Sequence, residues 1–373
     1  MDSPSFHPAL SLVVLTRNRQ SYLQRFLESL FSQVRKNEDG EGLPDDGHVE
    51  VLIVDDGSTD GTENLIRFWQ ARHRNLRYIR QDHRGIPAAR NNGLRNCKGQ
   101  IIAFVADDYR LPPGYISSIL EFFKHFPQAK ILRFRVVSRG FSVASRVNAI
   151  RYEAQVRRAL QPGLEGRACG RPGRLRLDGQ PSSGPQEAST TRHRLEASGG
   201  AAFRREVFSD VGDFDECLKR AEDVDFARRA REINIPIYLN PAIKIEHAEG
   251  LSFPEVISKN FRSGFYQAWF ELKSRDGDAV GPSAHRLELI LAEAMGSPSR
   301  LLSQAALADS HLTRFLSLPI LLAFELSHGL GFGWGLLRYN PRFHSWPAVK
   351  IQEKQTGDLN EKRPKGNNPG ADA

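Results

Sequence analysis

Short apolar runs alternate with stretches of helical hydrophobic spacing over the first third of the chain. The apolar runs predict buried strands at residues 11–16, 49–56, 76–80 and 99–108. Apolar residues three or four positions apart predict helices at residues 21–34, 63–70, 87–97 and 112–126. Apolar strands that alternate with helices are typical of a parallel sheet covered on both faces. The pattern therefore predicts a doubly wound, Rossmann-like α/β fold with a mostly parallel sheet.

Two of the predicted helices carry signals for where they begin. Ser21, followed three residues later by Gln24, has the form of a capping box. Pro112 or Pro113 is expected at the start of the fourth helix, because proline is tolerated in the first turn.

The second half of the chain changes character. Residues 136–197 are rich in Arg, Gly, Pro and Ser and lack a clear period. They are expected to form either a mobile lid over a site or a solvated insertion. The expected division is an N-terminal extension (1–9), two halves of a main domain (10–135 and 198–250) separated by this insertion (136–197), a helical region (251–345) and a disordered tail (346–373).

One C-terminal segment, residues 315–338, is long and apolar enough to cross a bilayer. Pro319, Glu325, His328 and several glycines argue against a simple span. A membrane-surface or re-entrant helix is the favoured interpretation, ahead of a true span and of a soluble core helix. An amphipathic, aromatic stretch, residues 259–272, precedes it.

Composition narrows the choice of partner and compartment. The 373 residues carry a formal net charge of +8, which favours nucleic acid, phosphorylated metabolites or an anionic membrane surface as partners. The three cysteines form neither a metal knuckle nor a disulfide pattern, so free thiols in a reducing cytosol are expected. The first ten residues lack the features of a signal peptide.

Polar residues follow three of the predicted strands: Thr16 to Arg19, Asp55 to Ser58, and Asp107 with Asp108. The carboxyl ends of parallel strands meet at one sheet edge, where open α/β sheets bind ligands. One acidic end is commonly a solvated turn, but three polar ends at one edge indicate a site. The chain has no G-x-G-x-x-G after the first strand and no G-x-x-x-x-G-K-[ST]. This argues against a dinucleotide dehydrogenase or a P-loop NTPase.

The same stretches resemble the successive motifs of glycosyltransferase family 2. The resemblance covers about residues 10 to 250 and rests, in order, on VVLTRNR, VEVLIVDDGSTDGT, GIPAARNNGLRNCKGQIIAFVADDYRLPPGY, GAAFRREVFSDVGDFDE and AEDVDFARRARE. It implies a GT-A fold whose first half binds a nucleotide sugar and whose second half binds the acceptor. It also implies sugar transfer with inversion and a divalent metal, Mg²⁺ or Mn²⁺.

The expected partners follow from the same resemblance. A UDP-sugar is the favoured donor, and a glycan or lipid-linked acceptor is expected, in polysaccharide, glycolipid or cell-envelope synthesis. Nucleic acid is not expected as a partner. The apolar segment 315–338, its flanking arginines and the net positive charge predict a peripheral or anchored position on the cytoplasmic membrane face.

Residues of the first two strand ends match nucleotide contacts of the family. Thr16 and Arg19 match the first strand end. Asp56 matches a carboxylate that contacts the base or ribose, and Asp55 is a candidate to share that role. The alternative for this motif is that Asp56 or Ser58 caps the following helix.

The third strand end departs from the usual D-x-D motif, since its first position is Ala106. Asp108 is then the expected metal ligand, and Asp107 a contact to ribose or to metal-bound water. His247 is a candidate to complete the metal shell, with a purely structural histidine as the alternative. Arg90 matches a position beside the nucleotide, with an ordinary surface arginine as the alternative. Diphosphate oxygens and water would fill the remaining metal positions, so the metal is expected mainly with the donor.

The second half carries the expected acceptor site. The resemblance gives Asp223 the role of the base that takes the proton from the acceptor hydroxyl, with Glu222 as an acceptor contact or as a support for Asp223. Gly199 and Gly200 are expected to permit close approach of the acceptor. Acidic residues in a first helical turn can also be simply stabilising.

Two other functions compete with an active transferase. A catalytically inactive relative that binds nucleotide sugars as a scaffold is supported by Ala106 and opposed by Asp108, Glu222 and Asp223. A sugar nucleotidyltransferase would need a glycine-rich phosphate loop after the first strand, and TRNRQSY is not one.

Overall fold

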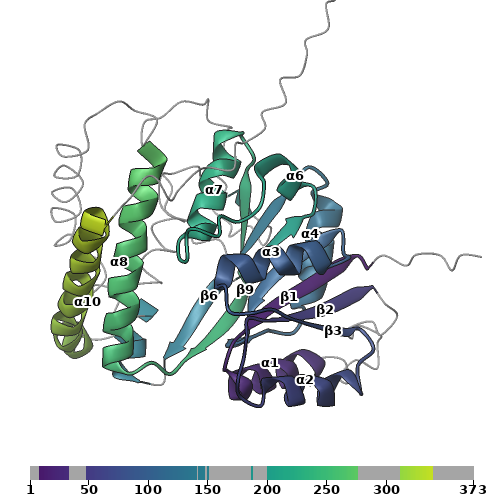
Figure 1. Cartoon of the computed structure of the whole chain (residues 1–373), viewed down its shortest axis with the longest axis horizontal. Helices are drawn as coiled ribbons and strands as arrows, with labels where there is room; N and C mark the ends of the chain where they lie inside the picture. The colour runs from purple at the N-terminus through teal and green to yellow at the C-terminus, as the bar shows by residue number, and fades with distance from the viewer. Residues whose placement is uncertain are drawn as a thin grey trace, which may run out of the picture.

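The computed structural model describes residues 8–32, 48–140, 142–147, 149–150, 186–187, 200–275 and 311–338. Its centre is a nine-stranded sheet in the order β3-β2-β1-β4-β8-β6-β9-β5, with β7 added to β9 (Figure 1). The strands are β1 (Leu10–Thr16), β2 (Val49–Asp55), β3 (Leu76–Arg80), β4 (Ile101–Ala106), β5 (Tyr109–Arg110), β6 (Ile131–Gly140), β7 (Gln186–Glu187), β8 (Gly200–Arg204) and β9 (Ile237–Glu249).

The helices occur between these strands and after the last of them. They are α1 (Gln20–Ser32), α2 (Thr62–Gln70), α3 (Ile86–Asn96), α4 (Tyr115–His125), α6 (Val207–Val211), α7 (Glu222–Glu232), α8 (Phe253–Arg275) and α10 (His311–Arg338). The four strands and four helices expected in the first third of the chain are all present, within a few residues of the predicted bounds.

The first four strands pair in parallel, and the rest of the sheet is mixed. β1 lies between β2 and β4, and β2 pairs with β3, all in parallel. β8 runs antiparallel to both β4 and β6, while β9 runs parallel to β6. The α/β fold with helices on both faces is therefore confirmed, with its parallel part in the first half of the chain.

Alternate residues of each central strand pack into two different cores. Leu12 belongs to a cluster with Phe26 of α1, on the face that α1, α2 and α4 cover. Val13, the next residue of β1, belongs to a cluster with Phe226 of α7, on the face that α3, α6 and α7 cover. Both faces of the strand are buried, which explains why its sequence is apolar without alternation.

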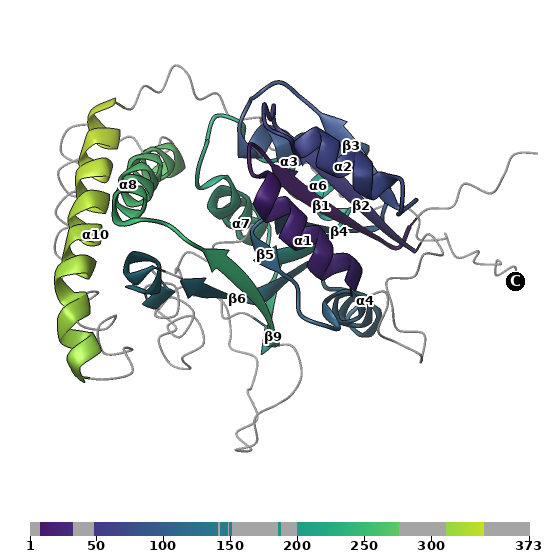
Figure 2. The same ribbon diagram turned by 90° about the horizontal axis from the view of Figure 1, so that it is seen from below.

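Helices α8 and α10 lie side by side, on the far side of the molecule from β1, β2 and β3 (Figures 1 and 2). Their axes approach closely at glycines. A Cβ atom at Gly331 would meet the carbonyl oxygen of Phe261, and one at Gly264 would meet that of His328. Small residues of this kind let two helix backbones come together.

Helix α10 exposes apolar side chains and buries several polar ones. Leu326, Leu330 and Leu337 are 58%, 70% and 73% exposed, whereas Glu325 and His328 are buried. Of the described helices, α10 alone is long and apolar enough to cross a membrane, through residues 317–338. It runs as one helix through Pro319, without the break that a re-entrant segment would show.

The predicted capping box of α1 is wrong. The helix begins at Gln20, so Ser21 already lies within its first turn. The Gln20 N–H donates to Asp60 Oδ2 at 3.2 Å, and the Gln24 side chain bonds to Glu28 one turn further on. The start of α1 is therefore fixed by a carboxylate from a distant loop.

The predicted start of α4 is also displaced. The helix begins at Tyr115, after Gly114 in a left-handed conformation with φ of 76°. Pro112 and Pro113 precede this turn instead of forming the first turn of the helix.

The boundary expected at residue 135 falls inside a strand, because β6 continues to Gly140 and pairs with β9 over its whole length. Most of the insertion expected at 136–197 lies outside the described residues, and its role as a lid stays a prediction.

Candidate active site

The ends of β1 and β4 meet because the two strands are neighbours in the sheet. Arg19, after β1, donates from Nη1 to Asp107 Oδ1 and from Nη2 to Asp108 Oδ2, both at 2.8 Å. Thr16 Oγ1 donates to the other oxygen of Asp107 at 2.8 Å. The ends of β1 and β4 therefore form one cluster, in which Arg19 bridges the adjacent carboxylates. The third predicted polar end is bonded to the first, since the Asn18 N–H donates to Ser58 Oγ at 2.9 Å.

His247 reaches this cluster through the pairing of β5 with β9, in which Tyr109 is opposite His247. The Nε2 atom of His247 lies 3.1 Å from Asp108 Oδ2. The other oxygen of Asp108, Oδ1, is buried and has no hydrogen-bond partner among the described residues. The structure thus brings together Asp108 and His247, the two expected metal ligands.

The two carboxylates differ in how readily they ionise. Burial opposes ionisation of Asp108, but its hydrogen bond to His247 and the charges of His247 and Arg19 hold its pKa at about 2. Burial raises the pKa of Asp107 to about 7, even though Arg19 favours the charged form, and the charge of Asp108 adds to the rise. A negative charge is therefore held at Asp108, the residue whose Oδ1 lacks a partner.

These residues could supply some, but not all, of the ligands of a divalent cation. A partnerless carboxylate oxygen and an adjacent imidazole nitrogen are suitable ligands. The described part of the chain contains no group of three or more His, Cys, Asp or Glu that could hold a metal. A bound diphosphate and water would have to supply the other ligands.

Asp56 is occupied by bonds within the protein. Its carboxylate accepts hydrogen bonds from Gln81 Nε2, from His83 Nδ1 and from the backbone N–H groups of Arg84 and Gly85, at 2.7–2.9 Å. Burial opposes ionisation, but these bonds hold the pKa of Asp56 below its usual value. Asp56 therefore fixes the loop between β3 and α3.

Asp55 is fully buried and likewise bonded within the protein. It accepts from the Ser58 N–H at 2.8 Å and from the Tyr78 hydroxyl at 3.0 Å. Helix α2 begins at Thr62, whose N–H donates to Asp60 Oδ1. The alternative that Asp56 or Ser58 caps α2 is therefore wrong: the N-cap residue is Gly61, and Asp60 accepts the Thr62 N–H.

Arg90 is buried, so the alternative of a surface arginine is wrong. Its Nη1 pairs with Glu222 at the start of α7, and its guanidinium lies 5.3 Å from the ring centre of Phe214. Burial raises the pKa of Glu222 to about 7, against the effect of Arg90 and with that of the nearby Asp223. The pair joins α3 to α7, which lie on either side of the expected insertion at residues 136–197.

Asp223 is the more accessible of the two acidic residues that begin α7. Its Oδ1 accepts the N–H of Val224 at 2.8 Å. Ala221, just before the pair, has a left-handed backbone with φ of 67°. Such a conformation is costly for a residue other than glycine, and it occurs where Glu222 is buried and Asp223 is not.

Gly200 lies inside the sheet, where a Cβ atom would come within 3.0 Å of Ile245 and 3.1 Å of Val136. Close packing is enough to explain this glycine, and its contact with an acceptor stays a prediction. Gly199 lies outside the described residues.

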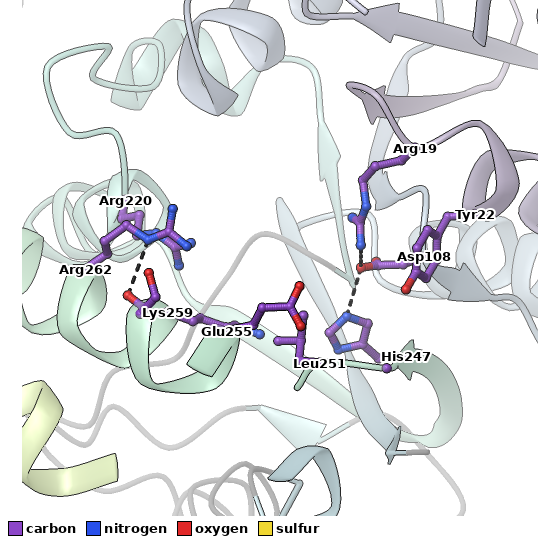
Figure 3. A pocket seen from close by; sticks show the side chains of 11 residues that line it. Arg19, Tyr22, Asp108, Arg220, His247, Leu251, Glu255, Lys259 and Arg262 are labelled. Carbon is purple, nitrogen blue, oxygen red and sulfur yellow. Dashed lines mark hydrogen bonds and ion pairs between the residues drawn. The ribbon is translucent and has the colours of Figure 1, made fainter. Parts of the chain in front are cut away.

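A cavity of about 320 Å³ opens beside Asp108. Its wall on one side is formed by Arg19, Tyr22, Asp108 and His247, and on the other by Arg220 and residues of α8 (Figure 3). Sequence reasoning missed Tyr22, over which the Arg19 guanidinium lies at 4.5 Å. It also missed the basic residues of α8, Lys259 and Arg262, whose one-turn spacing was the available signal.

Comparison with known proteins matches residues 11–212 to the family described as glycosyl transferase family 2. The chain belongs to this family. The chain is 31% identical over 114 residues to the putative glycosyltransferase EpsH of Bacillus subtilis, covering 31% of this chain and 30% of EpsH. It is 26% identical over 264 residues to a pre-mycofactocin glycosyltransferase of Mycobacterium tuberculosis, covering 70% of this chain and 46% of the relative. The chain thus spans less than half the length of both relatives.

The fold of the chain is GT-A. It resembles the mannosyltransferase PcManGT from Pyrobaculum calidifontis, solved in complex with GDP-Man and Mn²⁺, with a TM-score of 0.51 and 19% identity. The likeness covers 87% of this chain and 88% of that protein.

Proposed function

We propose that this glycosyltransferase moves a sugar, with inversion, from a nucleoside diphosphate sugar to an acceptor hydroxyl, and that Asp108 and His247 hold Mg²⁺ or Mn²⁺ against the diphosphate. The observation that carries the proposal is the partnerless Asp108 Oδ1, with His247 Nε2 3.1 Å from the other oxygen of the same carboxylate. The cavity next to this pair gives the donor room. PcManGT, which shares the fold, was solved with GDP-Man and Mn²⁺.

The chain supplies the remaining groups itself. Thr16 and Arg19 orient Asp107 and Asp108, and Arg19 holds positive charge near the donor phosphates. The metal, when bound, stabilises negative charge that develops on the leaving diphosphate. Asp223 takes the proton from the acceptor hydroxyl, and Glu222, held by Arg90, fixes the helix turn from which Asp223 projects. Contacts of Asp56 and Arg90 with the nucleotide stay predictions; both side chains also bond within the protein.

We further propose that the protein lies on a membrane, with a bilayer as the partner of the outer face of α10. That face exposes leucines while the polar residues of the helix are buried. Trp334 and Arg338 end it, as is common where a segment leaves the hydrocarbon layer. The net charge of +8 suits the anionic cytoplasmic face. A polysaccharide, glycolipid or other cell-envelope glycan is then the product.

The test is calorimetric binding of UDP and GDP with and without Mn²⁺, together with hydrolysis of UDP- and GDP-sugars. The wild type should bind one nucleotide in a Mn²⁺-dependent way and Asp108→Asn should not, while Asp82→Asn, an exposed carboxylate in the loop before α3, should behave as wild type. Binding by Asp108→Asn as tight as wild type would overturn the metal assignment. Binding of nucleotide sugars without any turnover, with acceptor extracts present, would favour the scaffold alternative.

A further inference from the structure

Arg19 is the side chain that joins the two acidic residues of the candidate active site. Its Nη1 donates to Asp107 Oδ1 and its Nη2 donates to Asp108 Oδ2, both at 2.8 Å. A guanidinium carries its N–H groups in a rigid planar fork, so it bonds to two carboxylates at once only in a narrow range of orientations. The contact therefore depends on the orientation of the Arg19 side chain as well as on its charge.

Burial alone does not set this orientation. The Arg19 side chain is 38% exposed, whereas those of Asp107 and Asp108 are 3% and 9% exposed. Fixing a long, partly exposed side chain in one rotamer costs conformational entropy. A contact that already restricts the side chain in the free protein lowers the cost of ordering it when a ligand binds.

The ring of Tyr22 supplies such a contact. Tyr22 follows Arg19 by three residues, in the first turn of α1, and the Arg19 guanidinium carbon lies 4.5 Å from the ring centre. A cation within about 6 Å of an aromatic ring centre is attracted by the ring. Arg19, Tyr22 and Asp108 lie together on one wall of the cavity (Figure 3). Arg19 is therefore held by the ring as well as by the carboxylates.

A second arginine approaches the same ring. The Arg25 guanidinium carbon lies 4.8 Å from the centre of the Tyr22 ring, and its Nε donates to a backbone carbonyl of α1 at 3.1 Å. The described residues include no bond between Arg25 and the two acidic residues, which are bonded by Arg19 instead. Of the two arginines, only Arg19 transmits the position of the ring to Asp108.

We infer that Tyr22 is a positioning residue of the donor site. Its ring holds Arg19 across Asp107 and Asp108. Arg19 in turn bonds to Asp108 Oδ2, while Oδ1 of the same carboxylate has no partner among the described residues. Oδ1 is the atom proposed to bind the metal. This role rests on the proposed function, because the ring acts on the donor through Arg19, Asp108 and the metal.

Loss of the ring should have two measurable effects. Arg19 should become more mobile in the free protein, because its partly exposed side chain loses one of its contacts. Binding of a nucleoside diphosphate with Mn²⁺ should weaken by about two- to fivefold, the equivalent of a cation–π contact at an exposed site, because Arg19 has to be ordered during binding. Phenylalanine keeps the ring without the hydroxyl, so Tyr22→Phe should preserve both properties.

The test uses two measurements on the full-length protein. NMR relaxation of ¹⁵N-labelled arginine side chains reports the order of the Arg19 Nε–H group without any ligand. Calorimetry gives the Kd of UDP and of GDP with Mn²⁺. The test variants are Tyr22→Leu, Tyr22→Phe, Arg19→Met and Tyr22→Leu/Arg19→Met. The control is Phe68→Leu, which removes from α2 a ring whose centre lies 3.6 Å from the guanidinium carbon of Arg72.

Tyr22→Leu should lower the order of the Arg19 Nε–H group and weaken nucleotide binding, whereas Tyr22→Phe and Phe68→Leu should match the wild type in both measurements. Arg19→Met should weaken binding as well. Tyr22→Leu should add no loss in the Arg19→Met background, because the ring acts through Arg19.

Three results would overturn the role of Tyr22. The first is an Arg19 side chain that is equally ordered in Tyr22→Leu and in the wild type. The second is a loss of binding in Tyr22→Phe as large as that in Tyr22→Leu, which would assign the effect to the hydroxyl. The third is a further loss in the Arg19→Met background, which would mean that the ring contacts the donor directly.

The NMR measurement needs no nucleotide, so it tests the hold of Tyr22 on Arg19 separately from the proposed function. A wild type that does not bind UDP or GDP with Mn²⁺ would count against the proposed function, whatever the order of Arg19. Wild-type binding with Mn²⁺, together with unchanged binding and unchanged Arg19 order in Tyr22→Leu, would count against the role of Tyr22 alone.

Discussion

Arg90 and Glu222, 132 residues apart in the sequence, form a buried ion pair between α3 and α7. The pair connects α3 with the first turn of α7, which carries the proposed base Asp223. Each side chain is almost fully buried, so each depends on the other for its counter-charge. Together with the bonds between Asn91 of α3 and the Phe214 backbone, the pair joins α3 to the segment that leads into α7.

We expect this pair to show strong coupling in a double-mutant cycle at pH 8, above the Glu222 pKa of about 7. Arg90→Met and Glu222→Gln should each destabilise the protein by about 3–5 kcal/mol, because each leaves a buried charge unpaired. The double variant should lose less than the sum of the two. Urea unfolding gives the free energies, and strictly additive losses would contradict the pairing.

Asp223→Asn should lower kcat by about 10²–10⁴, the usual effect of losing a general base. Donor affinity should change little, because the base acts on the acceptor. Turnover and calorimetric donor binding are measured on the same variant, with NMR of the product linkage. An Asp223→Asn enzyme at full speed, or a product with retained anomeric configuration, would refute the inverting mechanism with this base.

Asp56→Asn should destabilise the fold near neutral pH by about 1.5–3 kcal/mol, as for a hydrogen bond to a charged group. The pKa of Asp56 is lower in the folded protein than in the unfolded chain. Its ionisation therefore stabilises the fold above about pH 3.9, and this contribution is lost as the pH falls through the folded-state pKa.

The difference in unfolding free energy between wild type and Asp56→Asn should accordingly shrink below that pH. Asp82→Asn, an exposed neighbour with the same change of charge, should show no such difference. A wild-type advantage that does not depend on pH would contradict this account of Asp56.

Leu326→Gln and Leu330→Gln should each weaken binding to anionic vesicles by roughly tenfold or more, since burying a leucine is worth about 1.5–3 kcal/mol. Phe68→Gln removes an apolar side chain that is 53% exposed from α2, away from α10, and serves as the control. Co-sedimentation measures the partition. If the leucine variants bind as well as wild type, the outer face of α10 does not contact the bilayer.

Two glycines of α10 should respond in opposite ways to alanine. A Cβ atom at Gly329 would meet no other part of the described chain within 4 Å, so Gly329→Ala should stabilise the helix by roughly 0.5–1 kcal/mol. Gly331 faces the Phe261 carbonyl, so Gly331→Ala should push α10 from α8 and reduce stability. Thermal unfolding and hydrogen exchange of α10 amides measure both effects. Stabilisation by both variants would show that the two helices do not pack at Gly331.

The sequence was sufficient for the first half of the fold because its signals are local. Leu12 and Val13 are both apolar because they face two different cores. The continuous apolar run in the sequence therefore predicts a strand that is buried on both faces. The cluster of strand ends followed from the geometry of parallel strands. The capping box failed because Asp60, which is distant in the chain, satisfies the Gln20 N–H in its place.

The hydrogen bonds of Asp56 and the ion pair of Arg90 within the protein could not be predicted, because their partners lie far along the chain. Four donors converge on Asp56 only after β3 and α3 are in place. Arg90 looks like a surface residue in a short polar helix until Glu222 packs against it. Both positions belong to the family motifs, but a motif does not distinguish a side chain that binds a ligand from one that bonds within the protein.

The contact between Asp108 and His247 has a consequence for the order of events during synthesis. The two residues are 139 positions apart, and they meet only when β9 has paired with β5. Such distant pairings form late, because a long loop must close first. A nascent chain that has already folded β1 to β4 therefore still lacks the histidine beside its acidic motif. Under the metal role proposed for His247, cleavage of the donor would begin only after β9 has been synthesised and paired, so shorter nascent chains would not consume donor.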